Sequence, residues 1–379
     1  MTRCPESLAA LLHLVAAGGG TEARRTLLER HAGPVEALRA GAPAWREAGL
    51  SQAQMDLLAR RAPLPARWQD WLGDARHHLV GWHDPDYPPS LRRGPNPPLA
   101  LFVAGEPARL WHPCVAVVGS RGPTPSGRDN AATFARALAA SGLAVASGMA
   151  AGIDAAAHEA ALAVDGLTIA VLGTGPDVAY PASNRRLHAR IAEAGVIVSE
   201  YPPGTGPLPF QFPARNRILA GLALGTLVIE AAERSGALIT ARLAAECGRE
   251  VFAVPGSVHN PLARGCHRLI RDGAALVESA GEVVAALKAQ AALLAQDLQT
   301  RLDAPIQPVQ DAVAGVGSGS GSGDPDYQTL WSALGHDPTA MDQLVERTRL
   351  TAAAVSSMLL LMELEGRVAS QHGRYFRLR

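Results

Sequence analysis

The sequence predicts an α/β protein whose central domain is a parallel, doubly wound sheet. Between about residues 80 and 290, short apolar runs alternate with amphipathic segments, which is the spacing of repeated βα units. The apolar runs predict seven strands: Val115–Val118, Leu143–Ala146, Leu167–Leu172, Val196–Val198, Thr226–Ile229, Val251–Val254 and Ala275–Val277. The intervening helices are expected to begin near Gly127, Gly152, Asn184, Arg215, Gly236 and Gly265. Ligands of such sheets bind at the carboxyl ends of the strands, so the loops that follow strands are the candidate functional segments.

A chain of 379 residues with 47% hydrophobic residues is long enough for two or three folded domains. No apolar run reaches the length of a membrane span. Glu6 and His13 interrupt the apolar N-terminal stretch, which indicates a helix of the mature protein and not a signal peptide. The four cysteines lack the Cys-x-x-Cys spacing of a zinc site: Cys4, Cys114, Cys247 and Cys266. This usage predicts a cytoplasmic protein with reduced thiols and no bound metal.

The formal net charge is zero, which counts against binding of duplex DNA by bulk electrostatics but leaves room for a local basic groove. Lys288 is the only lysine, so the other basic residues are arginines. Genomic base composition explains the preference for arginine over lysine as well as a functional role does. Any phosphate or base contact in this protein nevertheless uses a planar guanidinium, which can stack as well as pair.

Composition divides the chain into four parts. Residues 1–75 have helical periodicity throughout, and residues 80–290 carry the βα repeats. Residues 291–323 lose this pattern and end in Gly-Ser repeats, which predicts a flexible linker. Residues 324–379 have the outline of a winged helix. Its predicted elements are helices Tyr327–Leu334, Met341–Thr348 and Thr351–Glu365, and strands around Arg367–Ala369 and Tyr375–Leu378.

The segment Ser199–Arg217 is the strongest functional signal in the chain. Its proline and glycine content predicts a stiff loop after a buried strand. The loop carries Phe210 and Phe212 and ends in Arg215, Asn216 and Arg217 at the start of an apolar helix. Aromatic rings beside guanidinium groups suit a flexible, negatively charged polymer with flat bases, which is single-stranded nucleic acid.

Two further loops follow predicted strands and suit an anion. In Gly119–Gly127, Arg121 stands where a dinucleotide-binding loop has its second glycine, so two roles fit: a phosphate contact at the helix N-terminus or a surface ion pair. In Ser147–Asp154, Gly148 and Gly152 fit either a nest of N–H groups around a phosphate or close packing of helix on strand.

Other polar residues favour structure over chemistry. Asp154 and His158 lie four apart on a helix; they fit an acid–base pair or half a metal site, but a structural hydrogen bond is the preferred interpretation. Tyr180 and Pro181 mainly fix the shape of their loop, and Glu230 at a strand end lacks a second carboxylate or nucleophile. The sequence has no nucleophile elbow, P-loop or HExxH motif, which favours binding over catalysis.

Taken together, eight segments resemble the DNA-processing protein A family, also called DprA or Smf. They are His83–Leu91, Val115–Gly127, Ser147–His158, Thr168–Asn184, Ser199–Thr205, Phe212–Leu222, Val228–Ala241 and Arg249–Gly256. They follow the family's order and cover nearly all of residues 83–277, which makes the ordered set far more specific than any one motif.

The resemblance implies an extended Rossmann-like core that binds single-stranded DNA, without a cofactor, as a homodimer formed through that core. It also implies protection of incoming DNA in natural transformation and loading of a RecA-type recombinase, with single-strand-binding protein as a further candidate partner. By analogy the DNA site comprises Gly119, Ser120, Arg121, Ser147, Gly148, Gly152, Phe212, Arg215, Asn216 and Arg217. Pro209 departs from the family, since many relatives have a basic residue there; Arg128 is a possible substitute. Phe210 is an additional aromatic residue beside the family motif. It offers either a second stacking surface or a side chain that fills the core beneath the loop.

The sequences of the two flanking domains indicate their function less specifically than the sequence of the core does. The N-terminal region resembles a helix-hairpin-helix or SAM-like module, for which a DNA contact and a protein contact both fit. The predicted helix Thr351–Glu365 has two glutamates and no basic residue, so docking to a protein or to the core is favoured over major-groove reading. Arg374 and Arg377 leave a smaller DNA role open.

The alternative function is enzymatic. Nucleotide phosphoribohydrolases of the LOG or lysine-decarboxylase-like type share a Rossmann-like fold and carry a PGGxGTxxE loop. This chain instead has LALGTLVIE, which ends at Glu230 and contains no Pro-Gly-Gly. Binding without catalysis is therefore the leading expectation.

Overall fold

The computed structural model describes residues 5–302 and, beyond them, residues 329–331, 334, 339–348, 350, 355, 358–359, 362, 367–371 and 374–377. The chain divides into two compact units, Met1–Ala314 and Gly315–Arg379. Cys4, residues 303–323 of the predicted linker and most of the predicted helix Thr351–Glu365 lie outside the described residues.

The first unit begins with a group of short helices. They are α1 (Pro5–Ala16), α2 (Glu22–Arg30), α3 (Pro34–Arg39), α4 (Gly41–Glu47), α5 (Gln52–Arg60) and α6 (Ala66–Leu72). Leu14, Leu27 and Trp45 are among the buried residues of their shared core. The Gly-rich turn between α1 and α2 is tied down through its carbonyls, because Gln54 donates to Gly18 and Arg24 donates to Gly19.

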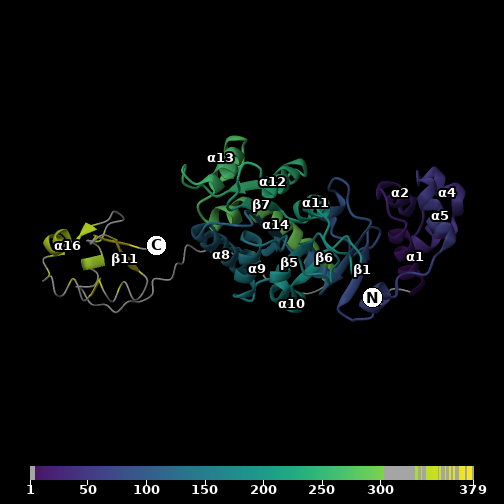
Figure 1. Cartoon of the computed structure of the whole chain (residues 1–379), viewed down its shortest axis with the longest axis horizontal. Helices are drawn as coiled ribbons and strands as arrows, with labels where there is room; N and C mark the ends of the chain where they lie inside the picture. Colours follow the sequence, from purple (N-terminus) through teal and green to yellow (C-terminus); the bar gives the residue numbers. More distant parts are fainter. Residues whose placement is uncertain are drawn as a thin grey trace. The chain divides into compact units, whose positions relative to one another are not determined.

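A nine-stranded sheet lies at the centre of the described part of the first unit, in the order β1-β2-β6-β5-β4-β3-β7-β8-β9 (Figure 1). The strands are β1 (His77–Gly81), β2 (Ala100–Ala104), β3 (Cys114–Val118), β4 (Ala144–Ser147), β5 (Thr168–Leu172), β6 (Val196–Ser199), β7 (Gly225–Val228), β8 (Glu250–Ala253) and β9 (Ala275–Leu276). Seven neighbouring strands of the sheet, β6-β5-β4-β3-β7-β8-β9 in spatial order, are parallel. Strand β2 pairs antiparallel with both β1 and β6. The predicted α/β parallel sheet is confirmed, and its strand order reverses direction between β3 and β7.

Helices cover both faces of the sheet because alternate strand residues point to opposite sides. Val115 and Val117 pack in one core with α8, α9 and α14, whereas Ala116 and Val118 pack in the other with α11, α12 and α13. The helices of the core are α7 (Pro89–Arg92), α8 (Pro125–Ala140), α9 (Ile153–Leu162), α10 (Arg185–Ala194), α11 (Gln211–Leu222), α12 (Gly236–Glu246), α13 (Arg264–Arg271) and α14 (Ala280–Leu302). The sheet is therefore doubly wound, as predicted.

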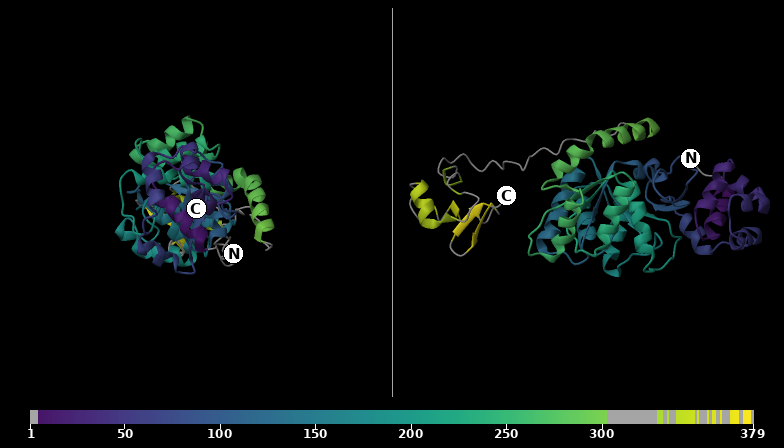
Figure 2. Two further views of the ribbon diagram at one scale, coloured as in Figure 1. Left: turned by 90° about the vertical axis from the view of Figure 1, so that its right-hand side faces the viewer. Right: turned by 90° about the horizontal axis from the view of Figure 1, so that it is seen from above.

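Two boundaries differ from the predictions. Helix α11 begins at Gln211, four residues before the predicted start near Arg215; Pro213 is tolerated because it lies in the first turn, where no N–H is needed. Helix α14 continues to Leu302 (Figure 2), so the linker does not begin at residue 291. Its sequence there is rich in Ala, Leu and Gln, which are strong helix formers.

The second unit contains a small antiparallel sheet in the order β10-β12-β11. Its described elements are β10 (Thr339–Ala340), α16 (Met341–Thr348), β11 (Val368–Gln371) and β12 (Arg374–Arg377). Leu330, Leu344 and Val368 are among its buried core residues, and the Arg367 guanidinium lies 4.4 Å from the centre of the Trp331 ring. The predicted hairpin is present, and β10 adds a third strand that the sequence pattern did not reveal.

Within the described ranges, none of the helices is both long and apolar enough to cross a lipid bilayer.

Candidate nucleic-acid interface

A cleft of about 610 Å³ opens where β3 and β7 end, at the reversal of strand order. This is the position at which doubly wound sheets bind ligands. Seven of the ten predicted residues line it: Gly119, Ser120, Arg121, Gly148, Phe212, Arg215 and Asn216. Segments from two loops and the first turns of α11 are thus brought to one site.

The ring of Phe212 is the centre of a small stack inside the cleft. The Arg121 guanidinium lies 5.9 Å from the centre of this ring. Tyr180 lies on the same ring, with centroids 5.1 Å apart and planes inclined by 35°. Gly173 leaves room for the ring, since a Cβ there would come within 3.0 Å of it. Phe212 therefore holds a cation and a second aromatic ring at the mouth of the cleft.

Arg215 forms the floor of the cleft. Its side chain is only 5% exposed, and it donates a hydrogen bond to the carbonyl oxygen of Val171. Burial lowers the pKa of Arg215 to about 10, an effect that nearby Asp154 partly offsets, so the guanidinium stays charged at neutral pH. Gly148 makes this possible, because a Cβ there would lie 2.6 Å from the guanidinium carbon. The glycine is thus explained by close packing against an arginine.

Ser147 and Gly152 do not line the cleft within the described structure but support its walls. The buried Ser147 hydroxyl donates to the carbonyl of Val117 over 2.7 Å. Gly152 has φ of +84°, and a Cβ there would lie 2.7 Å from the carbonyl oxygen of Arg121. The turn that carries Arg121 rests directly on this glycine.

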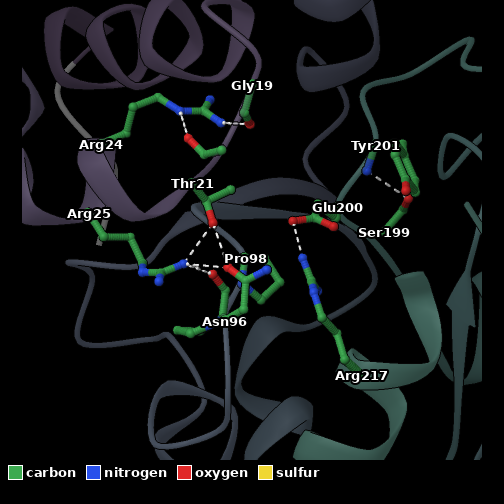
Figure 3. A network of polar contacts seen from close by, with 12 residues as sticks. Gly19, Thr21, Arg24, Arg25, Asn96, Pro98, Ser199, Glu200, Tyr201 and Arg217 are labelled. Atoms are coloured by element: carbon green, nitrogen blue, oxygen red, sulfur yellow. Dashed lines mark hydrogen bonds and ion pairs between the residues drawn. The ribbon is translucent and has the colours of Figure 1, made fainter. Parts of the chain in front are cut away.

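Arg217 points away from the cleft toward the N-terminal helices (Figure 3). It pairs with Glu200 over 2.5 Å, and both side chains are largely buried. Arg25 of α2 lies in the same network and donates to Thr21 and to the carbonyl oxygen of Pro97. Of the predicted DNA residues, Arg217 is therefore the one whose side chain serves the junction between the N-terminal helices and the core.

The opposite wall of the cleft was missed as a binding feature. It comprises Arg234, Ser235 and Gly236 at the N-terminus of α12. Ser235 caps this helix by accepting a hydrogen bond from the N–H of Ala237. The Ser-Gly pair after a predicted strand end was the available signal, because free N–H groups at such a helix start favour an anion.

The structure also shows where the residues lie that depart from the family pattern or could compensate for it. Pro209 lines the cleft but brings no charge. Arg128 is exposed on α8 and does not line the cleft within the described structure. Phe210 is 66% exposed, so the interpretation of this ring as core is wrong.

Asp154 and His158 are held in structural hydrogen bonds, as preferred from the sequence. Asp154 accepts from the N–H groups of Gly148 and Ala150, and burial raises the pKa of its carboxyl group. The ring of His158 bonds to Thr168 over 2.6 Å. The described residues contain no cluster of His, Cys, Asp and Glu that could hold a metal ion.

Glu230 anchors the N-terminus of α8. It accepts hydrogen bonds from the N–H and hydroxyl groups of Thr124 and from the side chain of Asn260. Its carboxylate packs against Gly127, where any side chain would overlap it. Glu230, the residue on which the phosphoribohydrolase alternative rests, does not line the described cleft.

Comparison with known proteins decides the family. The family model for DNA recombination-mediator protein A matches residues 78–288. The chain belongs to this family. A second model, the DprA winged helix domain, matches residues 318–374 and confirms the predicted winged helix. The recombination-mediator family's core thus coincides with the sheet and cleft described above.

Relatives of the recombination-mediator family are similar over most of the chain. Protein Smf of Escherichia coli is 40% identical over 82% of this chain and 79% of its own length. DNA processing protein DprA of Streptococcus pneumoniae is 49% identical over 53% of this chain and 71% of its own. Its crystal structure superposes with a TM-score of 0.65 at 37% identity, over 75% of this chain and 98% of that one.

A structure of DNA processing protein A from Helicobacter pylori is similar at 29% identity, with a TM-score of 0.50. It covers 56% of this chain and 95% of that chain. Its description reports a single-stranded DNA binding mode for the Helicobacter protein.

Proposed function

We propose that the cleft binds single-stranded DNA and that the protein acts by binding, without catalysis. The observation that carries this proposal is the arrangement of Arg121, Phe212 and Arg215, in which two guanidinium groups and an aromatic ring meet at one cleft. Stacking rings beside cations are the general means of holding a single strand without reading its sequence. The single-stranded DNA binding reported for the Helicobacter relative supports the same assignment.

The cleft offers different groups to the two parts of a nucleotide. Arg121, exposed on its turn, and Arg234 at the start of α12 are available to phosphates. The rings of Tyr180 and Phe212 are available to bases. A chain with zero net charge can bind DNA in this way because three arginines and one acidic residue, Asp154, line the described cleft.

Replacing Arg121 and Phe212 by alanine should weaken binding of an oligo-dT for different reasons. Loss of a phosphate contact should make the slope of log K against log salt shallower by roughly 0.7. Loss of the Phe212 ring should cost about 1–3 kcal/mol and leave the salt slope nearly unchanged. Fluorescence anisotropy over a series of salt concentrations measures both quantities.

Arg217→Ala is the matched control, since this arginine lies on the same helix but points away from the cleft. Its salt slope should equal that of the wild type. Equal affinities of the wild type and Arg121→Ala across the salt series would show that the DNA site lies elsewhere.

We further propose that the protein delivers the bound strand to a RecA-type recombinase, protects incoming DNA in transformation and works as a homodimer. The family's description as a recombination mediator supports the first role. The edge strand β9 supports dimer formation through the core, since its Leu276 is 48% exposed. Single-strand-binding protein is the partner that the mediator would displace.

The mediator role predicts faster loading of a RecA-type recombinase. On DNA covered by single-strand-binding protein, the recombinase's DNA-dependent ATPase should start sooner when this protein is added. Arg121→Ala should lose the acceleration in proportion to its loss of DNA binding. Acceleration that persists in a variant unable to bind DNA would contradict delivery of a bound strand.

A further inference from the structure

We propose that Tyr180, and not Phe212, is the ring on which a base stacks, and that Phe212 is a positioning residue behind it. The inference rests on the proposed function, because it names the base platform of the same cleft. Three observations carry it: which groups lie against Phe212, how Tyr180 is exposed, and where both rings lie.

Phe212 is half-buried and lies against three neighbours. Its ring packs at the end of β5, so closely that a Cβ on Gly173 would lie 3.0 Å and 3.3 Å from two of its carbons. The Arg121 guanidinium and the Tyr180 ring also lie against it. A base that stacked on Phe212 would have to displace one of these groups. The ring therefore suits support better than direct contact.

Tyr180 is the outer member of the pair. Its side chain is 41% exposed and lines the cleft, in the loop that follows β5. The ring rests on Phe212 at a centroid distance of 5.1 Å, within the range of favourable aromatic pairs. Contact with a second ring orders the Tyr180 ring before DNA arrives, which reduces the entropy lost on binding. An ordered, exposed ring beside guanidinium groups is what a single-strand platform requires.

In this arrangement the Phe212 ring contacts both the Arg121 guanidinium and the Tyr180 ring. The phosphate contact and the base contact would be fixed relative to each other through one ring. Removal of Phe212 would take away the support of the Tyr180 ring and so weaken the base contact, whereas Arg121 would keep its charge and its phosphate contact, so the salt slope should stay nearly unchanged. Tyr180 and Arg121 should behave as separate contributors.

The test combines Tyr180 variants with oligonucleotides that lack single bases. Tyr180→Leu keeps apolar volume but removes the ring, and Tyr180→Phe keeps the ring. With intact oligo-dT, Tyr180→Leu should bind roughly 5- to 140-fold more weakly, the equivalent of one stacked base. Tyr180→Phe should bind with close to wild-type affinity. The salt slope should be that of the wild type in both variants.

Oligonucleotides that lack one base distinguish a direct contact between Tyr180 and a base from a role of Tyr180 in supporting other residues. In the wild type, removal of the base at one position should weaken binding by the same factor, and in Tyr180→Leu removal of that base should cost nothing more. If Tyr180→Leu binds weakly but keeps the abasic penalty, or binds like the wild type, Tyr180 is not the platform although the cleft still binds DNA. If wild-type protein does not bind oligo-dT at any salt concentration, the proposed function itself fails.

Discussion

Gly152→Ala is expected to destabilise the fold and to remove most of the DNA affinity together. Gly152 has φ of +84° and ψ of −122°, a conformation that only glycine adopts readily. A Cβ there would overlap the carbonyl oxygen of Ser120 and lie 2.7 Å from that of Arg121. Both obstacles are backbone atoms, which cannot turn aside. Backbone strain and overpacking each cost about 1–3 kcal/mol, so the free energy of unfolding should fall by about 2–6 kcal/mol.

The loss of affinity follows from what rests on Gly152. Ser120 donates to the carbonyl of Glu230 and accepts from the N–H of Ile153, so its turn is fixed on two sides. A displaced turn would carry Arg121 away from the cleft. Loss of its charge-assisted contact, worth about 1.5–3 kcal/mol, corresponds to roughly 10- to 100-fold weaker binding.

Gly122→Ala is the control for this prediction. Gly122 lies in the same turn, but nothing lies within 4 Å of a Cβ added there. Denaturant unfolding and anisotropy should show this variant close to the wild type, within about 0.5 kcal/mol. Equal effects of the two substitutions would mean that the turn is sensitive to any side chain and that Gly152 is not its support.

The parallel strands were predictable because each is an apolar run bounded by glycine-rich turns. Strands β1 and β2 were not predicted, although β2 is buried along its whole length. They pair antiparallel at the edge of the sheet and are separated only by the four-residue helix α7, so the βα spacing that revealed the other strands does not apply to them. Their pairing depends on long-range contacts that no local pattern encodes.

The site shows the same division between local and non-local signals. The loops that meet at the cleft were predicted from their positions after strands. The direction of Arg217 was not, because it follows from the phase of α11 and not from the composition of the segment. On a helix, residues two apart point about 200° apart, so Arg215 and Arg217 do not face one cleft. The phase of one helix thus decided the role of one predicted DNA residue.

The second large effect is expected from His158, whose burial makes the fold sensitive to acid. The hydroxyl of Thr168 donates its one hydrogen to the carbonyl of Val145, so it accepts from the N–H at Nδ1 of His158. Burial lowers the pKa of His158 to about 3, and the positive charge of Arg215 adds to this effect. The unfolded chain therefore binds a proton near pH 6.5, where the folded protein does not.

The sign follows from proton linkage. Stability from a neutral His158 is fully present above pH 6.5 and is lost as the pH falls from 6.5 toward 3. At pH 4.5 the loss should be about 2.7 kcal/mol, at 1.36 kcal/mol for each pH unit. Asp154 acts in the opposite direction, since a raised pKa of its carboxyl adds stability as the pH falls. A comparison of variants that all keep Asp154 removes this contribution.

His158→Asn keeps a donor near Thr168 but does not titrate. It should be less stable than the wild type at pH 7, because the smaller side chain leaves a cavity. The difference should shrink by about 2.7 kcal/mol between pH 7 and pH 4.5 in urea unfolding. The exposed His259→Asn is the control and should follow the wild-type curve. Parallel curves for wild type and His158→Asn would contradict a depressed pKa at His158.

The same neutral histidine is tied to the DNA site through Arg215. Asp154 offsets part of the cost of burying the Arg215 guanidinium, whereas a charged His158 would repel it. A neutral His158 therefore suits the buried cation of the cleft floor. Because the pKa of His158 is about 3 in the folded protein, oligo-dT binding should have the same pH dependence in the wild type and in His158→Asn between pH 7 and 5.5, where both remain folded. A steeper loss of binding in the wild type over this range would show that the folded protein protonates His158 far above pH 3, which contradicts a depressed pKa.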